Sequence, residues 1–269
     1  MMTLAISPCP NDTFIFCGMK DRYDLVLDDV EALNHGAERG AFDIVKISVA
    51  AYGRIRAEYA LLRAGGAAGF GVGPLLVASR EREPGGRIAI PGERTTAALL
   101  LTLLDLPSEA RSAKEGSFET VPMRFDRIED AVLAGDVDAG VLIHEGRFTY
   151  ADKGLVKLAD LGEVWEQRMR GPLPLGAIAI RRALGADTAR AIDEEIRASL
   201  RQAWADPAGC SAFVRAHSQE MAPHVVQQHI DLYVNDYSLN LDETAVERLV
   251  ALSEQAGGYP VSSAPVFAY

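Results

Sequence analysis

The stretch DAGVLIHEGRFTY, at residues 138–150, decides the expected fold because it places an apolar run directly before a histidine. Residues 139–143 are apolar and are bounded by Gly135 and Gly146, a pattern typical of a buried strand in a parallel sheet. His144 follows at the carboxyl end of this predicted strand. Open α/β sheets bind their ligands at the carboxyl ends of strands. We therefore expect an α/β fold with a ligand site near His144.

His144 is the first candidate for chemistry, because an imidazole group exchanges a proton near neutral pH. A structural histidine that hydrogen-bonds a loop is the alternative, and position alone leaves both open. Glu145 is the nearest rival base. Side chains alternate along a strand, so a strand that continued here would turn Glu145 to the face opposite His144.

The composition is that of a globular protein and limits the partners. The chain has 269 residues, of which 48% are hydrophobic and 24% charged, and it carries a net charge of −11. This length suits one large domain or two of moderate size. The negative charge argues against nucleic-acid binding and against anionic membranes. A small anionic substrate remains compatible with it, because helix N-termini attract anions locally.

The cysteines and the apolar runs predict the compartment. Cys9, Cys17 and Cys210 are odd in number and form no CxxC pair, which argues against a disulfide framework and a zinc site. Residues 1–12 lack the pattern of a signal peptide, and the longest apolar run, residues 97–106, is too short to span a bilayer. We expect a cytoplasmic protein that does not associate with membranes.

Alternating strand and helix patterns fill the chain. Strands are expected at residues 3–6, 23–27, 42–47, 75–78, 87–90, 118–122, 139–143, 155–158 and 177–180. Helices are expected at residues 13–19, 30–39, 49–55, 97–104, 125–133, 161–170, 187–205, 207–217, 223–234 and 242–255. His217, His224 and His229 lie on the last helices without the spacing of zinc ligands, so we interpret them as surface or packing residues.

Two junctions, at residues 79–87 and 171–176, divide this pattern into two lobes. We expect residues 1–85 and 175–269 to form the first lobe and residues 86–174 the second, with the ligand cleft between them. The SPCPND stretch, residues 46–48, residues 95–96 and His144 all follow predicted strands. Several helix N-termini near one site predict an anionic ligand, most simply a carboxylate. Taken singly, Lys46 is typical of a solvated surface charge, and Ser48, Thr95 and Thr96 are typical of helix caps.

Six stretches of the chain together resemble the 1,4-dihydroxy-6-naphthoate synthases. They are SPCPNDTFIF at residues 7–16, VKISVAAY at 45–52, GVGPLLVA at 71–78, GERTTA at 92–97, LIHEGRFTY at 142–150 and LPLGAI at 173–178. The resemblance runs from residue 7 to about residue 241, and SPCPND with IHEGRFTY is its specific part.

The resemblance implies an enzyme of the futalosine route to menaquinone. Members convert cyclic dehypoxanthinyl futalosine to 1,4-dihydroxy-6-naphthoate by breaking a carbon–carbon bond to the sugar-derived part. They look like periplasmic-type solute-binding proteins of type II, in which each of two lobes is a mixed sheet flanked by helices. They work in the cytoplasm, and no metal or organic cofactor is implied.

Matching the family's motifs residue by residue implies the site. The proton acceptor falls on His144, and the substrate-binding positions fall on Asn34, Lys46, Ile47, Ser48, Thr96 and Ala97. Val49 departs from the family pattern, in which an aromatic residue is expected at this position. This change alters one expected wall of the pocket and leaves the implied chemistry untouched.

Two other functions compete with the lyase. A solute-binding protein that captures a carboxylate without chemistry would share the fold, but a secreted binder should carry a signal segment. The related chorismate dehydratase also shares the fold, and the SPCPND stretch argues against it. The substrate in either enzyme is a small anionic molecule, and the sequence leaves a monomer and a homodimer equally open.

Overall fold

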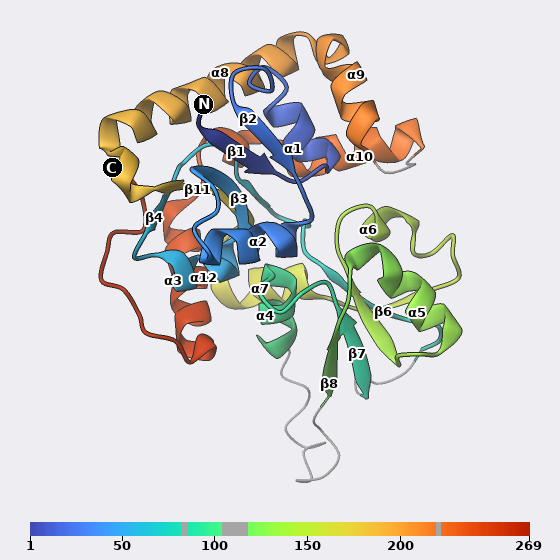
Figure 1. The fold of residues 1–269 in the computed structure, drawn as a ribbon. Helices are drawn as coiled ribbons and strands as arrows, with labels where there is room; N and C mark the ends of the chain where they lie inside the picture. The colour runs from blue at the N-terminus through green and yellow to red at the C-terminus, as the bar shows by residue number, and fades with distance from the viewer. Residues whose placement is uncertain (82–85, 104–117, 219–221) are drawn as a thin grey trace. The chain divides into compact units, whose positions relative to one another are not determined.

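The structure, a computed structural model, describes residues 1–81, 86–103, 118–218 and 222–269 and divides into two compact units. Unit 1 combines Met1–Gly69 with Pro174–Tyr269, and unit 2 is Phe70–Leu173 (Figure 1). Each unit contains one sheet with both parallel and antiparallel pairs, and helices flank it. The α/β class and the mixed sheets expected from the sequence are confirmed.

The first change of unit falls earlier in the chain than the expected boundary at residue 85. It lies at Gly69 and Phe70, because strand β6 (Leu75–Ala78) pairs with β9 and β10 of unit 2. The polar stretch at residues 80–87 suggested a junction, and residues 82–85 of it lie outside the described residues. The return to unit 1 at Pro174 differs from the expected residue 175 by one position.

The sheet of unit 1 brings the carboxyl ends of three parallel strands to one edge. Its order is β2 (Asp24–Leu27), β1 (Thr3–Ile6), β3 (Ile44–Ser48), β11 (Leu173–Arg181) and β4 (Tyr59–Leu61), and β5 (Ala67–Gly69) also pairs with β11. Strand β1 is parallel to β2 and β3, whereas β11 is antiparallel to β3 and β4. The residues that follow β1 and β3 therefore meet at the same edge.

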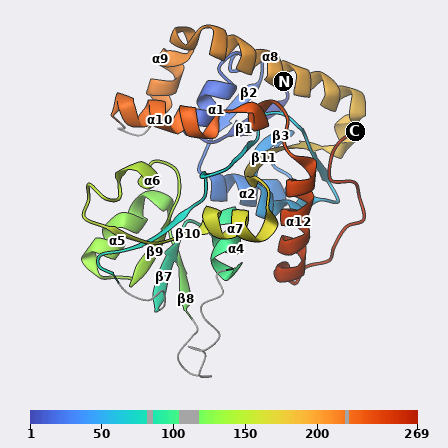
Figure 2. The same cartoon turned by 180° about the vertical axis from the view of Figure 1, so that it is seen from behind.

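Helices cover both faces of this sheet (Figures 1 and 2). On one face α1 (Pro10–Ile15) contacts α8 (Ala186–Ala205), α9 (Pro207–His217) and α10 (Pro223–Tyr233). Here Leu4 and Ile6 of β1 pack with Ile192, Ile196 and Leu200 of α8, which share one face of that helix as their spacing predicts. On the other face lie α2 (Val30–Glu38), η1 (Val49–Ala51), α3 (Tyr52–Ile55) and α12 (Glu243–Gly257). The short helix α11 (Asp236–Leu239) contacts β5.

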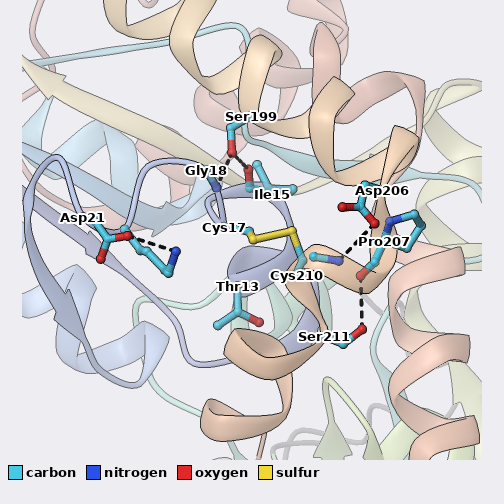
Figure 3. The surroundings of a disulfide bond; sticks show 12 residues. Thr13, Ile15, Cys17, Gly18, Asp21, Ser199, Asp206, Pro207, Cys210 and Ser211 are labelled. Carbon is cyan, nitrogen blue, oxygen red and sulfur yellow. Dashed lines mark hydrogen bonds and ion pairs between the residues drawn. A yellow bond between two sulfur atoms is a disulfide. The ribbon is translucent and has the colours of Figure 1, made fainter.

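A disulfide joins Cys17, which follows α1, to Cys210 of α9 (Figure 3). The sequence argued against a disulfide framework, and this single bond corrects that expectation. The two cysteines are 193 residues apart, so no local spacing could reveal them, and helix packing brings their Cα atoms to 5.7 Å. Beside the bond, Ser199 Oγ donates to the Ile15 carbonyl at 2.6 Å and accepts from the Gly18 amide at 3.0 Å (Figure 3).

The sheet of unit 2 has the order β10 (Val156–Asp160), β6, β9 (Ala139–Leu142), β7 (Arg87–Ile90) and β8 (Glu119–Pro122). Strand β9, expected in a parallel sheet, is parallel to β7 and antiparallel to β6. It is buried throughout because helices lie on both sides of the sheet. Helix α5 (Ile128–Ala134) packs on one face, and α4 (Thr96–Leu103) and α7 (Leu161–Met169) pack on the other.

Most elements lie within a few residues of their expected bounds, and the helix expected at residues 125–133 splits into η3 (Phe125–Arg127) and α5. Among the described helices, none combines the length with the apolar character that crossing a membrane would need.

Candidate functional site

Lys46 lies inside unit 1, with 4% of its surface exposed, and is therefore not the solvated surface charge that its position alone suggested. Its Nζ forms an ion pair with Asp12 Oδ1 at 2.7 Å and donates to the Gly65 carbonyl at 3.0 Å. A buried ammonium group is tolerated only with such partners. Strand β3 thus carries a charged group into the protein interior.

Asp12 organises the loop after β1. Pro10 begins α1 at a position where its missing N–H costs nothing, and Asp12 follows in the first turn. The Asp12 carboxylate accepts from the Ser7 hydroxyl at 2.6 Å and from the Ser7 amide at 3.3 Å. The SPCPND stretch is therefore closed by its own aspartate, which at the same time holds Lys46.

Asn34 and Ser48, expected at the site from different elements, contact each other directly. The Ser48 amide donates to Asn34 Oδ1 at 2.9 Å, and Asn34 Nδ2 donates to Ser48 Oγ at 3.2 Å. Because the Ser48 hydroxyl accepts this bond, its own proton can still be donated. Ile47 and Val49 on either side are fully buried, so their side chains belong to the core.

His229 is a polar neighbour that sequence reasoning placed only among surface or packing residues. It is buried on α10, and its Nε2 lies 3.0 Å from Asn11 Oδ1, 218 residues away in the sequence. Asn11 Nδ2 in turn donates to Asp12 Oδ1 at 3.0 Å. A lysine inside the apolar run at residues 44–47 was the one sequence signal of this cluster, because a buried lysine requires a carboxylate partner.

Thr96 and Ala97 begin α4 of unit 2, and both are buried. Thr95, directly before them, has a structural role. Its Oγ1 donates to the Gly92 carbonyl at 2.8 Å and accepts from the Ala98 amide at 3.1 Å, which is the geometry of a helix cap. Of the two threonines in the GERTTA stretch, the structure therefore assigns the capping to Thr95.

His144 lies in a turn and not at the end of a strand as expected. Strand β9 ends at Leu142, and the backbone of His144 is left-handed with φ of 55°. Strand alternation therefore says nothing about Glu145, and that expectation is corrected. The half-buried His144 ring contacts Phe125 edge to face, with centroids 4.9 Å apart. Left-handed backbone at a residue other than glycine is uncommon and concentrates at functional sites.

Two ion pairs surround this turn. Arg147, in α6 (Gly146–Thr149), pairs with Asp160 Oδ2 at 2.8 Å and anchors the turn to the residue that caps α7. Lys153 pairs with Glu129. Burial raises the pKa of the Glu145 carboxyl above its ordinary value, and the nearby negative charge of Glu129 raises it further. Glu145 is therefore easier to protonate than an exposed glutamate.

The structure thus groups the expected residues into two sets. In unit 1, Asn34 contacts Ser48, and Lys46 two residues earlier on β3 contacts Asp12. In unit 2, Thr96 and Ala97 open α4, and His144 follows β9. Within the described part of the chain, no three His, Cys, Asp or Glu side chains are grouped so that they could hold a metal ion.

A family model and two named relatives identify the same family for this chain. A family model described as menaquinone biosynthesis matches residues 2–257. The chain is 44% identical to the 1,4-dihydroxy-6-naphthoate synthase of Thermus thermophilus, over 99% of this chain and 98% of that protein. It is 42% identical to the enzyme of that name from Streptomyces coelicolor, over 95% of this chain and 92% of that one.

Solved structures share the fold. A crystal structure of a protein from Archaeoglobus fulgidus superposes with a TM-score of 0.86 at 36% identity and covers 95% of this chain and 97% of that one. The alkanesulfonate-binding protein of Xanthomonas axonopodis pv. citri, bound to MOPS, gives a TM-score of 0.63 at 16% identity, over 86% of this chain and 83% of that one. The fold is therefore that of periplasmic-binding proteins, as expected.

Proposed function

Since the chain belongs to the menaquinone biosynthesis family, we propose that it is a 1,4-dihydroxy-6-naphthoate synthase acting as a carbon–carbon lyase. Its substrate would be cyclic dehypoxanthinyl futalosine and its product 1,4-dihydroxy-6-naphthoate. The observation that carries the proposal is the 44% identity to a named synthase over nearly the full length of both chains.

His144 is the proposed general base. The substrate must lose a proton while the carbon–carbon bond to its sugar-derived part breaks, and the electrons released complete the aromatic naphthoate ring. Aromatisation supplies the thermodynamic drive, so the protein mainly needs a positioned base. An imidazole group ordinarily titrates near pH ~6.5 and suits this role. The left-handed turn and the Phe125 contact, which restrict the ring, support the assignment.

The binding residues proposed for the substrate lie in both units. Ser48, held by Asn34, and Thr96, at the start of α4, would each donate a hydroxyl hydrogen bond to an anionic group. Ile47 and Ala97 have buried apolar side chains, so they would contribute through the main chain. Amides and hydroxyls at the beginning of a helix favour a carboxylate.

The decisive experiment incubates the purified protein separately with cyclic dehypoxanthinyl futalosine and with chorismate, and follows the products by mass spectrometry. We expect the naphthoate from the first compound and no conversion of the second. Dehydration of chorismate would replace the proposal with the related dehydratase. Tight binding of either compound without any product would indicate a solute-binding protein, whose fold this chain shares.

The setting of the enzyme is part of the same proposal. The net charge of the chain is −11, but the hydrogen-bond donors of the proposed site are a cation, Lys46, and two neutral hydroxyls, Ser48 and Thr96. These donors agree with a small anionic substrate. A cytoplasmic location agrees with relatives that are biosynthetic enzymes. Light scattering coupled to size exclusion would decide between a monomer and a homodimer.

A further inference from the structure

A chain of buried polar side chains runs through unit 1 from Lys46 to α10. Asp12 is its centre, because its carboxylate accepts from Ser7, from Asn11 Nδ2 at 3.0 Å and from Lys46 Nζ at 2.7 Å. His229 is its far end, with Nε2 at 3.0 Å from Asn11 Oδ1. We call Lys46, Asp12, Asn11 and His229 the Asp12 network, and all four are buried.

The directions of these hydrogen bonds follow from chemistry. A carboxylate only accepts, so the Asn11 side chain must present its Nδ2 to Asp12. Its Oδ1 then faces α10 and needs a donor. Nε2 of His229 therefore carries a proton and donates to Asn11, whether or not the rest of the ring is charged. Helices α1 and α10, which carry this contact, lie side by side in both views (Figures 1 and 2).

The fold also makes room for Lys46. Gly176 lies opposite the end of β3 on β11, and a Cβ at that position would stand 2.9 Å from Lys46 Cε. An ammonium group has three N–H donors, and among the described residues Asp12 and Gly65 take two of them. The direction of the third is therefore set by how Asp12 is held.

We propose that His229 is a positioning residue, which acts through Asn11 and Asp12 to aim the Lys46 ammonium group at the substrate. The inference rests on the proposed function, in which Lys46 is a substrate-binding residue. His229 donates to Asn11, the fixed amide of Asn11 donates to Asp12, and Asp12 sets the position of Lys46. Without the His229 donor the Asn11 side chain can rotate, and Asp12 loses one of its donors.

Stability alone does not account for this arrangement. Well-packed apolar side chains often stabilise a core as much as a buried polar or ionic cluster does. Helices α1 and α10 also carry buried apolar side chains, among them Phe14 and Val225. A hydrogen-bonded chain that ends on a lysine at the ligand-binding edge of the sheet is instead suited to holding that lysine in one direction.

The test measures the dissociation constant of cyclic dehypoxanthinyl futalosine by titration calorimetry in the His144→Asn background, in which turnover should be slow. His229→Phe keeps a ring against Tyr233 and removes the donor. We expect it to weaken binding by about two- to twelve-fold, the equivalent of one hydrogen bond. His229→Gln, which can present an N–H to Asn11, should recover most of the affinity.

A double-mutant cycle separates positioning from packing. If His229 acts through Lys46, then His229→Phe should weaken binding in the presence of Lys46 and have no further effect in a Lys46→Met protein. A purely structural role would give the same loss in both backgrounds, and this result would overturn the inference.

The matched control is Val225→Ala on the same helix, which shortens a buried apolar side chain and leaves all four residues of the Asp12 network unchanged. It should lower the melting temperature and leave the dissociation constant unchanged. If Lys46→Met weakens binding and His229→Phe does not, the inference fails and the proposed site stands. If Lys46→Met has no effect, both the inference and the role of Lys46 fail. If the compound does not bind the parent protein, the proposed function itself fails.

Discussion

The loop at residues 7–12 in unit 1 and the turn at residues 143–145 in unit 2 both follow a buried strand, yet they are built in opposite ways. In the first, Asp12 is buried and its carboxylate oxygens are bonded to Ser7, Asn11 and Lys46. In the second, His144 is half-exposed, with left-handed backbone and an edge contact to Phe125.

This difference matches the two tasks proposed for these regions. Groups that bind a substrate gain from being held in advance, because the cost of ordering them is met during folding. A group that moves a proton must instead reach the reacting atom and change its own protonation state. Substitutions in the first region should therefore alter stability and binding, whereas those in the second should alter turnover.

The largest effect is expected in the turn. His144→Asn removes the proposed base and should lower kcat by about 10²- to 10⁴-fold, with little change in melting temperature. Steady-state kinetics and thermal unfolding of the same preparation would show both. Glu145→Gln is the control and should retain most of its turnover. If Glu145→Gln lost turnover while His144→Asn kept it, the base would be the neighbouring residue.

The buried ion pair should show the opposite pattern. Asp12→Ala leaves the Lys46 charge buried without its carboxylate, and such a loss costs about 3–5 kcal/mol in the free energy of unfolding. Urea unfolding would measure it. The double variant Asp12→Ala with Lys46→Met removes both charges and should recover part of the loss. A single variant as stable as the wild type would mean that the pair does not form.

The disulfide beside the same loop should contribute less. It ties the end of α1 to α9, and removing a native disulfide typically costs about 2–4 kcal/mol. Cys17→Ser with Cys210→Ser should lower the urea midpoint, whereas Cys9→Ser, at the cysteine outside the disulfide, is the control. A thiol titration of the unfolded, unreduced chain should find one free thiol. Three free thiols and an unchanged midpoint would contradict the bond.

Two adjacent threonines give the next comparison. Thr96→Val removes the proposed hydroxyl donor to the substrate at nearly constant volume. Because losing a hydrogen bond to a charged group costs about 1.5–3 kcal/mol, KM should rise several-fold or more. Thr95→Val removes the cap of α4 and should lower stability by about 0.5–2 kcal/mol with KM unchanged. The reverse assignment of effects would place the substrate contact on Thr95.

The smallest effect concerns the pH dependence of stability. The pKa of Glu145 is raised by burial, so the folded chain binds this proton more tightly than the unfolded chain does. The associated stability is present at acid pH and is lost as the pH rises through the raised pKa. The melting temperature of Glu145→Gln relative to wild type should therefore increase from acid to neutral pH. A difference that stays constant with pH would rule out a perturbed Glu145.

Local pattern accounts for the elements that sequence reasoning predicted well. The strands β1, β6 and β7 have the expected bounds, and the long helix α8 differs by one residue at its start. Such elements depend on apolar periodicity and on caps, both of which act within a few residues. The family resemblance, now confirmed, likewise rests on short contiguous motifs such as SPCPND.

Tertiary structure alone decided how those motifs are connected. The partners Asn11 and His229 are 218 residues apart, and Cys17 and Cys210 are 193 residues apart. The burial of Lys46, the pairing of β6 in unit 2 and the left-handed turn at His144 also depend on packing. A linear pattern indicates which apolar residues will face the core, but buried polar groups and the hydrogen bonds and disulfides between distant residues depend on how the helices and sheets pack in three dimensions.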